Sequence, residues 1–458
     1  MNRILVGSSA LIVFFVVHLA VAVLSVGGKR GLIIRATALF FASPLVLAAI
    51  GARAAEYTFV NIADGASAAP LGAFKSFSLP SISGNNVTFR GEYFDPAIDV
   101  GESGIFVGRG GPLTTIVKPG DLSAVGVIFQ QLSLPTISVQ TVAFSAMYRS
   151  SNDGAVRVGV FTGEGGPLTA IAKSGDITPS GTIIIRGQST PAIDGAKIAP
   201  NAEYPNDKSA LLVTDGATVT SIVTSGDPAP TGTFRQLSFS EPAISGSNVA
   251  FRGGYIRLGV GFETGIFTGS GGSLTTIAKT GDVAPSGVFS SFGVPSISED
   301  VAAFYGSYTG GAGIFTGSGG PLTAIAKSGD AIPSLGTFTI ISSDSIAISG
   351  NTVAFQARFG SPIQYGIFLA TGGSLSPLIK TGDPLFGSVV TTLNFGRFGI
   401  DPEGSGNIAF SYQLGDGRSG VALANPVPEP SSLALLAGIA IFTLRSACGK
   451  HKRLPDTV

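Results

Sequence analysis

Acidic side chains at one repeated position are the first candidates for chemistry in this chain. A Gly-Asp pair ends six similar stretches, and a Lys precedes the Asp by three residues in five of them, with Thr224 in the sixth. Calcium loops concentrate several carboxylates in one loop, which these stretches do not. We therefore expect each Asp to bond to the backbone of its own turn, partly neutralised by the Lys. The six are Asp121, Asp176, Asp227, Asp282, Asp330 and Asp383.

Tyrosine recurs at a second equivalent position. Such rings could form a binding rim that stacks on sugars, or they could pack between repeats with the hydroxyl at the water edge. Phe359 and Leu414 take this position in the last two repeats, which favours packing. The loop that follows is the most variable part of each repeat, and variable loops on a rigid scaffold often carry binding. The candidate rim residues are Tyr93, Tyr148, Tyr204, Tyr255 and Tyr308.

Catalytic machinery based on His or Cys has no residues to use outside the two chain ends. The chain has His18, His451 and Cys448 and no other residue of either type. Nucleophilic triads and the usual zinc sites need those side chains. We expect no catalytic residue, metal or cofactor. A carbohydrate-active enzyme with paired carboxylates is the alternative, and it would need two carboxylates about 5–10 Å apart in a pocket.

The elements that position these residues repeat with a period near 50 residues. The stretch GIFTGSGGPLTAIAKSGD spans 313–330, and the six aspartates are spaced by 55, 51, 55, 48 and 53 residues. Such a period is typical of a propeller or a solenoid. Each unit reads as four short strands joined by Gly- and Pro-rich turns, with gaps too short for helical crossovers. An all-β propeller is therefore predicted.

Counting the strands predicts seven blades over residues 56–425. Six units are complete between 74 and 383, and a seventh begins at Val389 and ends one strand short. The segment Tyr57–Ile62 resembles the missing strand. We predict that this N-terminal strand completes the seventh blade and closes the ring, because closure removes exposed sheet edges.

The amino end contains two apolar segments. Residues 1–27 form the first, which is either a membrane helix or an upstream stretch before the true start. Residues 28–55 read as a signal peptide, with Lys29, Arg30 and Arg35 before an apolar run and a small-residue site at 52–54. We therefore expect export.

The carboxyl end, residues 426–458, has three parts in a fixed order. Val427, Pro428, Glu429 and Pro430 precede an apolar run over 433–444. This order resembles the PEP-CTERM sorting signal of exported bacterial proteins. The apolar run is short, roughly 20 Å as a helix against a core of about 30 Å, so an ordinary membrane anchor is the alternative. The basic tail, which is more spread out than the family pattern, is Arg445, Lys450, Lys452 and Arg453.

The resemblance implies a route and a set of partners. An exosortase-type enzyme would cleave at the motif after a transient stay in the inner membrane, leaving the protein at the cell surface or in the extracellular matrix. Without the nine basic residues and the one acidic residue of the two ends, 19 basic and 27 acidic residues remain of 28 each, a net charge of about −8. Nucleic acid is therefore an unsuitable partner. We expect a structural or binding module for extracellular polysaccharide or a surface protein.

Overall fold

The computed structural model of the protein describes residues 56–427 except 71, 96–99, 122–125, 152, 179–180, 186–188, 205–207, 238–240 and 286. Every regular element in the described part is a β-strand. The predicted apolar segment (1–27), the signal peptide (28–55) and the sorting signal beyond Val427 lie outside the described residues.

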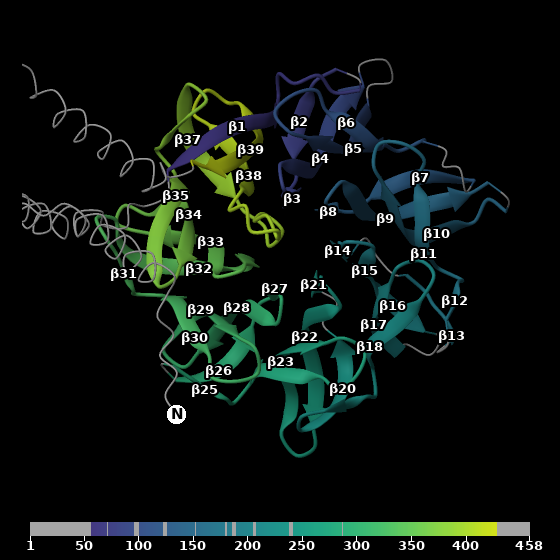
Figure 1. The fold of residues 1–458 in the computed structure, drawn as a ribbon, viewed down its shortest axis with the longest axis vertical. Coiled ribbons are helices and arrows are strands. Elements are labelled where there is room, and N and C mark those ends of the chain that lie inside the picture. Colours follow the sequence, from purple (N-terminus) through teal and green to yellow (C-terminus); the bar gives the residue numbers. More distant parts are fainter. Residues whose placement is uncertain are drawn as a thin grey trace, which may run out of the picture. The chain divides into compact units, whose positions relative to one another are not determined.

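Seven antiparallel blades lie around one axis (Figure 1), and each has four strands, which follow sequence order from the axis outward except that the first strand of the chain is outermost in blade 7. In most blades the first strand is split, with its second half next to the axis. Blade 1 has β2 (Phe74–Phe77), β3 (Ser81–Ser83), β4 (Asn86–Asp95), β5 (Val100–Gly108) and β6 (Thr114–Val117). Blade 2 has β7 (Val127–Leu132), β8 (Thr136–Ser138), β9 (Thr141–Ser150), β10 (Val156–Gly163) and β11 (Thr169–Lys173). Blade 3 has β12 (Ile177–Thr178), β13 (Gly181–Thr182), β14 (Ala192–Asp194), β15 (Lys197–Ala199), β16 (Asn201–Tyr204), β17 (Lys208–Thr214) and β18 (Val219–Thr224).

The remaining four blades keep this plan. Blade 4 has β19 (Pro228–Ala229), β20 (Gly232–Leu237), β21 (Ala243–Ser245), β22 (Asn248–Arg257), β23 (Gly261–Gly269) and β24 (Thr275–Lys279). Blade 5 has β25 (Val283–Ala284), β26 (Gly287–Phe292), β27 (Ser296–Ser298), β28 (Val301–Tyr308), β29 (Gly311–Gly317) and β30 (Thr323–Lys327). Blade 6 has β31 (Ala331–Ile332), β32 (Gly336–Ser349), β33 (Thr352–Phe359), β34 (Gln364–Thr371) and β35 (Ser374–Lys380). Blade 7 has β36 (Pro384–Leu385), β37 (Ser388–Asn394), β38 (Ile408–Leu414) and β39 (Ser419–Pro426), completed by β1 (Tyr57–Asp64).

The first and last strands of the described chain close the ring. β1 pairs antiparallel with β39, placing Phe59 opposite Ala424 and Asp64 opposite Gly420. The Val427 amide donates to the Glu56 carbonyl at 2.7 Å, so the two ends of the described chain lie together. The prediction of a seven-bladed propeller closed by an N-terminal strand is confirmed.

Phenylalanine rings fill the blades, because alternate residues of each strand point into the same inter-blade layer. In blade 1 the rings of Phe74 and Phe106 meet edge to face, 5.1 Å apart at 86°. Blade 1 and four other blades each contain a triplet of Phe rings, one from the first, one from the second and one from the third strand, and the first- and third-strand rings meet edge to face in all five. The glycine two residues before the third-strand Phe makes room for the ring. A Cβ on Gly265, for example, would lie 2.8 Å from the ring of Phe267. Blade 3 lacks the triplet, and Pro200 interrupts its second strand between β15 and β16.

The Gly-Asp turns link each blade to the next. In blade 4 the Lys279 amide donates to Asp282 Oδ2 at 3.0 Å, and the Asp282 amide donates to the Lys279 carbonyl at 3.1 Å. The same turn is hydrogen-bonded to the first strand of the next blade. The Gly281 amide donates to the Phe289 carbonyl, and the Phe289 amide donates to the Asp282 carbonyl. All six turns bond in this way, which confirms the turn interpretation of these aspartates.

The turns between first and second strands, hereafter the axial turns, join the blades around the axis. In each, the last residue of the first strand accepts a hydrogen bond from a backbone amide of the neighbouring blade. Six such links exist, from Val139 to Ser83, Gly195 to Ser138, Gly246 to Asp194, Glu299 to Ser245, Gly350 to Ser298 and Gly84 to Asp401, at 2.5–2.9 Å. Pro402 stands at the seventh donor position and has no amide proton, so the buried Ser349 hydroxyl has no partner among the described residues.

Candidate functional site

The propeller has two faces, which the alternation of strand direction defines. The hairpins between second and third strands and the Gly-Asp turns lie on one face, hereafter the hairpin face. The axial turns and the loops between third and fourth strands, hereafter the outer loops, lie on the other. Glu56 precedes the fourth strand of blade 7 and Val427 follows its third strand, so both belong to the second face. We call it the terminus face.

The five predicted rim tyrosines lie at the hairpin-face ends of β4, β9, β16, β22 and β28, as the repeat predicts. All five are buried, with exposed fractions between 0% and 7%. In four blades the ring lies edge-on against the third-strand Phe, as Tyr148 does against Phe161 at 5.5 Å. The rings fill the blades, as the packing interpretation predicts. A role of this series in ligand binding stays a prediction.

The tyrosine hydroxyls lie next to polar residues where the second-to-third-strand hairpins begin. Tyr93 donates to Glu102 Oε2 at 3.2 Å across the β4–β5 pair. Burial raises the pKa of Tyr255 to about 12, and it also raises the pKa of Tyr148 and Tyr308. These groups therefore stay protonated at neutral pH and can act as hydrogen-bond donors.

The hairpin tips differ in chemistry from blade to blade. In blade 2, Arg157 and Asp153 form an exposed ion pair at 2.5 Å that lowers the pKa of Asp153. In blade 4 the tip is apolar, with Leu258 94%, Val260 61% and Phe262 60% exposed. The tips of blades 1 and 3, residues 96–99 and 205–207, lie outside the described residues. The described tips thus present different groups on nearly identical strands.

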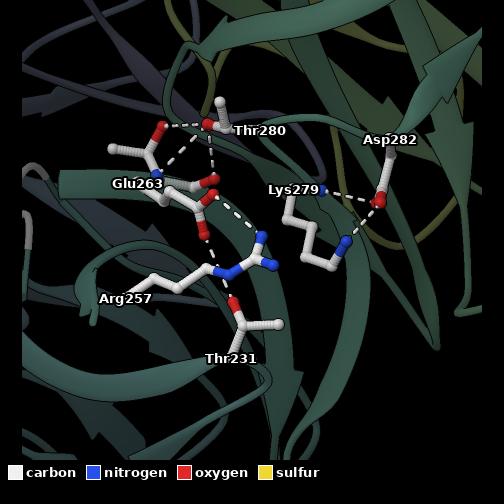
Figure 2. Close-up of polar contacts among 7 residues, drawn as sticks. Thr231, Arg257, Glu263, Lys279, Thr280 and Asp282 are labelled. Carbon is white, nitrogen blue, oxygen red and sulfur yellow. Dashed lines mark hydrogen bonds and ion pairs between the residues drawn. The ribbon is translucent and has the colours of Figure 1, made fainter. Parts of the chain in front are cut away.

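A polar cluster supports the apolar tip of blade 4 (Figure 2). Glu263 is buried, accepts a hydrogen bond from the Thr231 hydroxyl at 3.2 Å and lies 3.7 Å from the Arg257 guanidinium. Beside it, Lys279 Nζ and Asp282 Oδ1 are 2.5 Å apart. Each carboxylate is engaged by a neighbour on its own blade. The Thr264 amide donates to the Thr280 hydroxyl at 3.2 Å, which connects the hairpin to the Gly-Asp turn.

An arginine crosses the axis of the propeller. Arg397 is almost fully buried, with Nε 3.2 Å from Glu241 Oε2, and its Nη1 donates to the Glu241 carbonyl. Burial lowers the pKa of Arg397 to about 10, while the Glu241 charge opposes this shift. A cavity of about 40 Å³ adjoins the pair, room for a few water molecules. The pair ties blade 7 to blade 4.

A larger groove lies on the terminus face between blades 4 and 5, with a volume of about 560 Å³. Ser245–Asn248, Thr268–Ser270 and Glu299–Asp300 contribute to its walls. Its side chains are hydroxyls, one amide and two carboxylates. Within the described part of the chain, no three His, Cys, Asp or Glu side chains are grouped as a metal site requires.

Sequence reasoning missed both the axial pair and the groove. An alignment of the repeats would have shown that Arg397 and Glu241 are charged where blade 1 has Leu79, although it would not have shown that the two meet. Of the predicted sorting motif, only Val427 is described. Pro428, Glu429, Pro430 and the basic tail lie outside the described residues.

Comparison with known families places most of the chain. A family model described as a family of unknown function, DUF7453, matches residues 53–434. The chain belongs to the DUF7453 family. A search of curated proteins finds no match. The part of this DUF7453 protein that the structure describes contains no helix long and apolar enough to cross a membrane.

Solved structures similar to this DUF7453 protein include other propellers. The β-propeller domain of the Trilobed protease from Pyrococcus furiosus is 10% identical, with 78% of this chain and 97% of that chain covered and a TM-score of 0.45. Pyrococcus horikoshii acylaminoacyl peptidase is 11% identical, with 79% and 53% covered and a TM-score of 0.43. The chain thus spans about half the length of that peptidase. A subtype N11 neuraminidase-like protein of A/flat-faced bat/Peru/033/2010 is 10% identical, with 68% and 92% covered and a TM-score of 0.33.

Proposed function

We propose that this protein is an exported, surface-anchored β-propeller that acts as a binding module through its hairpin face. The observation that carries the proposal is that both ends of the described chain lie on the same face of the ring. Glu56 and Val427 meet on the terminus face, so an anchor that continues from Val427 leaves the hairpin face pointing away from the attachment point. Loops on a rigid scaffold are the usual place for binding groups.

The route to the surface forms part of the same proposal. The signal peptide over 28–55 would start export, and an exosortase-type enzyme would recognise Val427–Pro430 and cleave there. Before cleavage, the apolar run at 433–444 and the basic tail hold the chain in the inner membrane. After cleavage, the propeller remains at the cell surface or in the matrix.

The partner class follows from the hairpin chemistry. An extracellular polysaccharide or a surface protein would contact several tips at once, each weakly, and gain strength through multivalency. The apolar tip of blade 4 and the charged tip of blade 2 supply contacts of different kinds. The buried tyrosines support the hairpins from below. They position the tips and do not present their ring faces to a ligand.

A tip substitution tests the proposal. Replacing Leu258, Val260 and Phe262 together by Ser should weaken binding of the labelled full chain to isolated cell envelope and matrix by about tenfold, since the exposed apolar area of these side chains would no longer be buried on binding. Val139→Ser is the matched control, because Val139 is 57% exposed on the terminus face. Equal binding by the triple variant and the unchanged protein would overturn the proposal.

The same assay separates binding from hydrolysis. Reducing ends released from bound matrix polysaccharide would support the alternative function, a carbohydrate-active enzyme on the propeller scaffold. A bound polysaccharide that keeps its length supports the binding module.

A further inference from the structure

The groove between blades 4 and 5 is formed by three segments of equivalent kind. Two are axial turns, at Ser245–Asn248 of blade 4 and Glu299–Asp300 of blade 5, and the third is the outer loop of blade 4. Each neighbouring pair of blades brings such segments together, because the repeat places them at the same height. The sequence differences between blades therefore show why this groove is open.

One residue of the outer loop differs in length between blades 1, 2 and 4. In blade 1 the tip residue is Arg109, whose Nε donates to Asn86 Oδ1 and folds over the axial turn. In blade 2 the tip residue is Glu164, which accepts a hydrogen bond from the Thr141 hydroxyl at 2.6 Å. In blade 4 the same position is Ser270, which is too short to cover the turn. The space that Arg109 and Glu164 fill in their blades is open beside Ser270.

The axial turns add acceptors to this open space. Asn248 Nδ2 donates to Asp300 Oδ1 at 3.1 Å, which joins the two walls and holds the Asp300 carboxylate at the groove. Glu299 adopts φ 54°, a left-handed conformation that Val139 adopts at this position in blade 2 (φ 56°) and that glycine adopts in four other blades, at Gly84, Gly195, Gly246 and Gly350. A side chain at this position is strained, so the carboxylate is present despite a cost that glycine avoids.

We propose that this groove binds a short segment of a neutral, hydroxyl-rich saccharide. Its volume lies within the range of about 300–1,000 Å³ that is usual for small-ligand sites. Carboxylates accept hydrogen bonds from sugar hydroxyls, and such charge-assisted bonds are stronger than neutral ones. The Ser and Thr hydroxyls and the Asn248 amide can both donate and accept.

The charge of the lining sets the specificity. Glu299 and Asp300 carry negative charge, while Lys197 of blade 3 donates a hydrogen bond to the Ser247 hydroxyl at the edge of the groove. A uronic-acid chain would bring its own carboxylates against these two, which the single charge of Lys197 offsets only in part. Like-charge contact of this kind excludes a wrong ligand more effectively than a missing contact does.

The site is separate from the proposed binding surface of the hairpins. It lies on the terminus face, on blades 4 and 5, while the chain ends leave from blade 7 on the other side of the ring (Figure 1). An anchored propeller would therefore turn this groove toward the cell that carries it. Loss of hairpin binding and loss of groove binding are consequently independent results.

The test introduces into the outer loop of blade 4 the Arg that covers the axial turn in blade 1. The full chain in detergent micelles is titrated with maltotetraose and with tetragalacturonate, observed by saturation-transfer NMR. Maltotetraose should bind, and Ser270→Arg should weaken it at least about tenfold by filling the groove as Arg109 fills its own. Ser318→Arg, the same change at the equivalent outer loop of blade 5, should leave binding unchanged.

A second variant tests the proposal if Ser270→Arg does not fold. Glu299→Gln removes one carboxylate at nearly constant shape and should weaken maltotetraose binding severalfold with an unchanged melting temperature. Four results would overturn the inference: no binding of maltotetraose, tighter binding of tetragalacturonate, equal loss in Ser318→Arg, or binding abolished by EDTA. The last result would assign the carboxylates to a cation.

Discussion

The buried hydroxyl of Tyr255, at the edge of blade 4, makes the free energy of unfolding depend on pH. Its ring lies against Phe234 and Phe267, and its hydroxyl is buried near Glu263 at the base of the hairpin. A hydroxyl in this setting is much harder to ionise than one in water, because burial penalises the charged form. The phenol is therefore part of the packing of blade 4.

Alkaline pH should destabilise the propeller partly through this residue. Burial raises the pKa of Tyr255 to about 12, while an unfolded Tyr titrates near 10. Above pH 10 the unfolded chain releases this proton and the folded chain keeps it, so the free energy of unfolding falls between pH 10 and 12. Below pH 10 this contribution is fully present.

Denaturant unfolding across pH 9–12 measures the effect. Tyr255→Phe should show a shallower loss of stability in that window, with the remaining slope carried by other buried tyrosines such as Tyr148 and Tyr308. Tyr365→Phe serves as the control for the same chemical change on a partly exposed ring. Identical slopes for Tyr255→Phe and the unchanged protein would contradict the assignment.

At the scale of elements, the axial turns act as a chain of hydrogen bonds with one interruption. Six links pass from blade to blade, and the one from blade 6 to blade 7 is missing because of Pro402. A buried hydroxyl without a partner costs free energy, whereas a paired one contributes modestly. The same substitution should therefore have opposite effects at two equivalent positions.

Ser349→Ala and Ser298→Ala form a matched pair. Ser349→Ala should leave the stability unchanged or raise it by up to about 1 kcal/mol, because it removes an unpaired buried hydroxyl. Ser298→Ala should lower it by about 1–2 kcal/mol, because the Gly350 amide loses its acceptor. Denaturant midpoints at constant slope give both values. Equal destabilisation by the two changes would show that Ser349 has a partner.

For the whole molecule, the proposed processing would act next to the two ends of the described chain, which lie together on blade 7. The last propeller strand, β39, ends at Pro426, two residues before Pro428, and the Val427 amide between them is bonded to the Glu56 carbonyl. Removal of residues beyond the motif would therefore leave every strand of the ring intact. Removal of the segment before residue 55 or 56 would likewise spare β1.

Intact mass spectrometry of the exported protein measures this processing. We expect a mature chain that starts at residue 55 or 56 and ends near Pro428–Pro430. Glu429→Ala should retain the C-terminal segment, while Glu403→Ala, a change of an exposed Glu in the axial turn of blade 7, should be processed normally. A mature wild-type chain that still carries residues 433–458 would show that the segment is a permanent anchor.

The sequence alone determined the repeat, the strand count and the closure of the ring. These features depend on local patterns: alternating apolar residues, Gly-rich turns and the Gly-Asp pairs occur within about 50 residues and recur. The missing strand of blade 7 could be assigned because an unpaired edge is unfavourable and one unused strand was available. Such arguments need no knowledge of distant side-chain contacts.

Only the tertiary structure decided what the side chains do. Arg397 and Glu241 are 156 residues apart and meet because ring closure brings blade 7 across the axis from blade 4. The groove needs turns from two blades and the short side chain of Ser270 at the same time. The tyrosines occupy the predicted strand positions, yet their burial depends on how far the neighbouring phenylalanines extend over them. Local periodicity fixes which face of a strand a residue lies on, while neighbouring blades fix whether that face is covered.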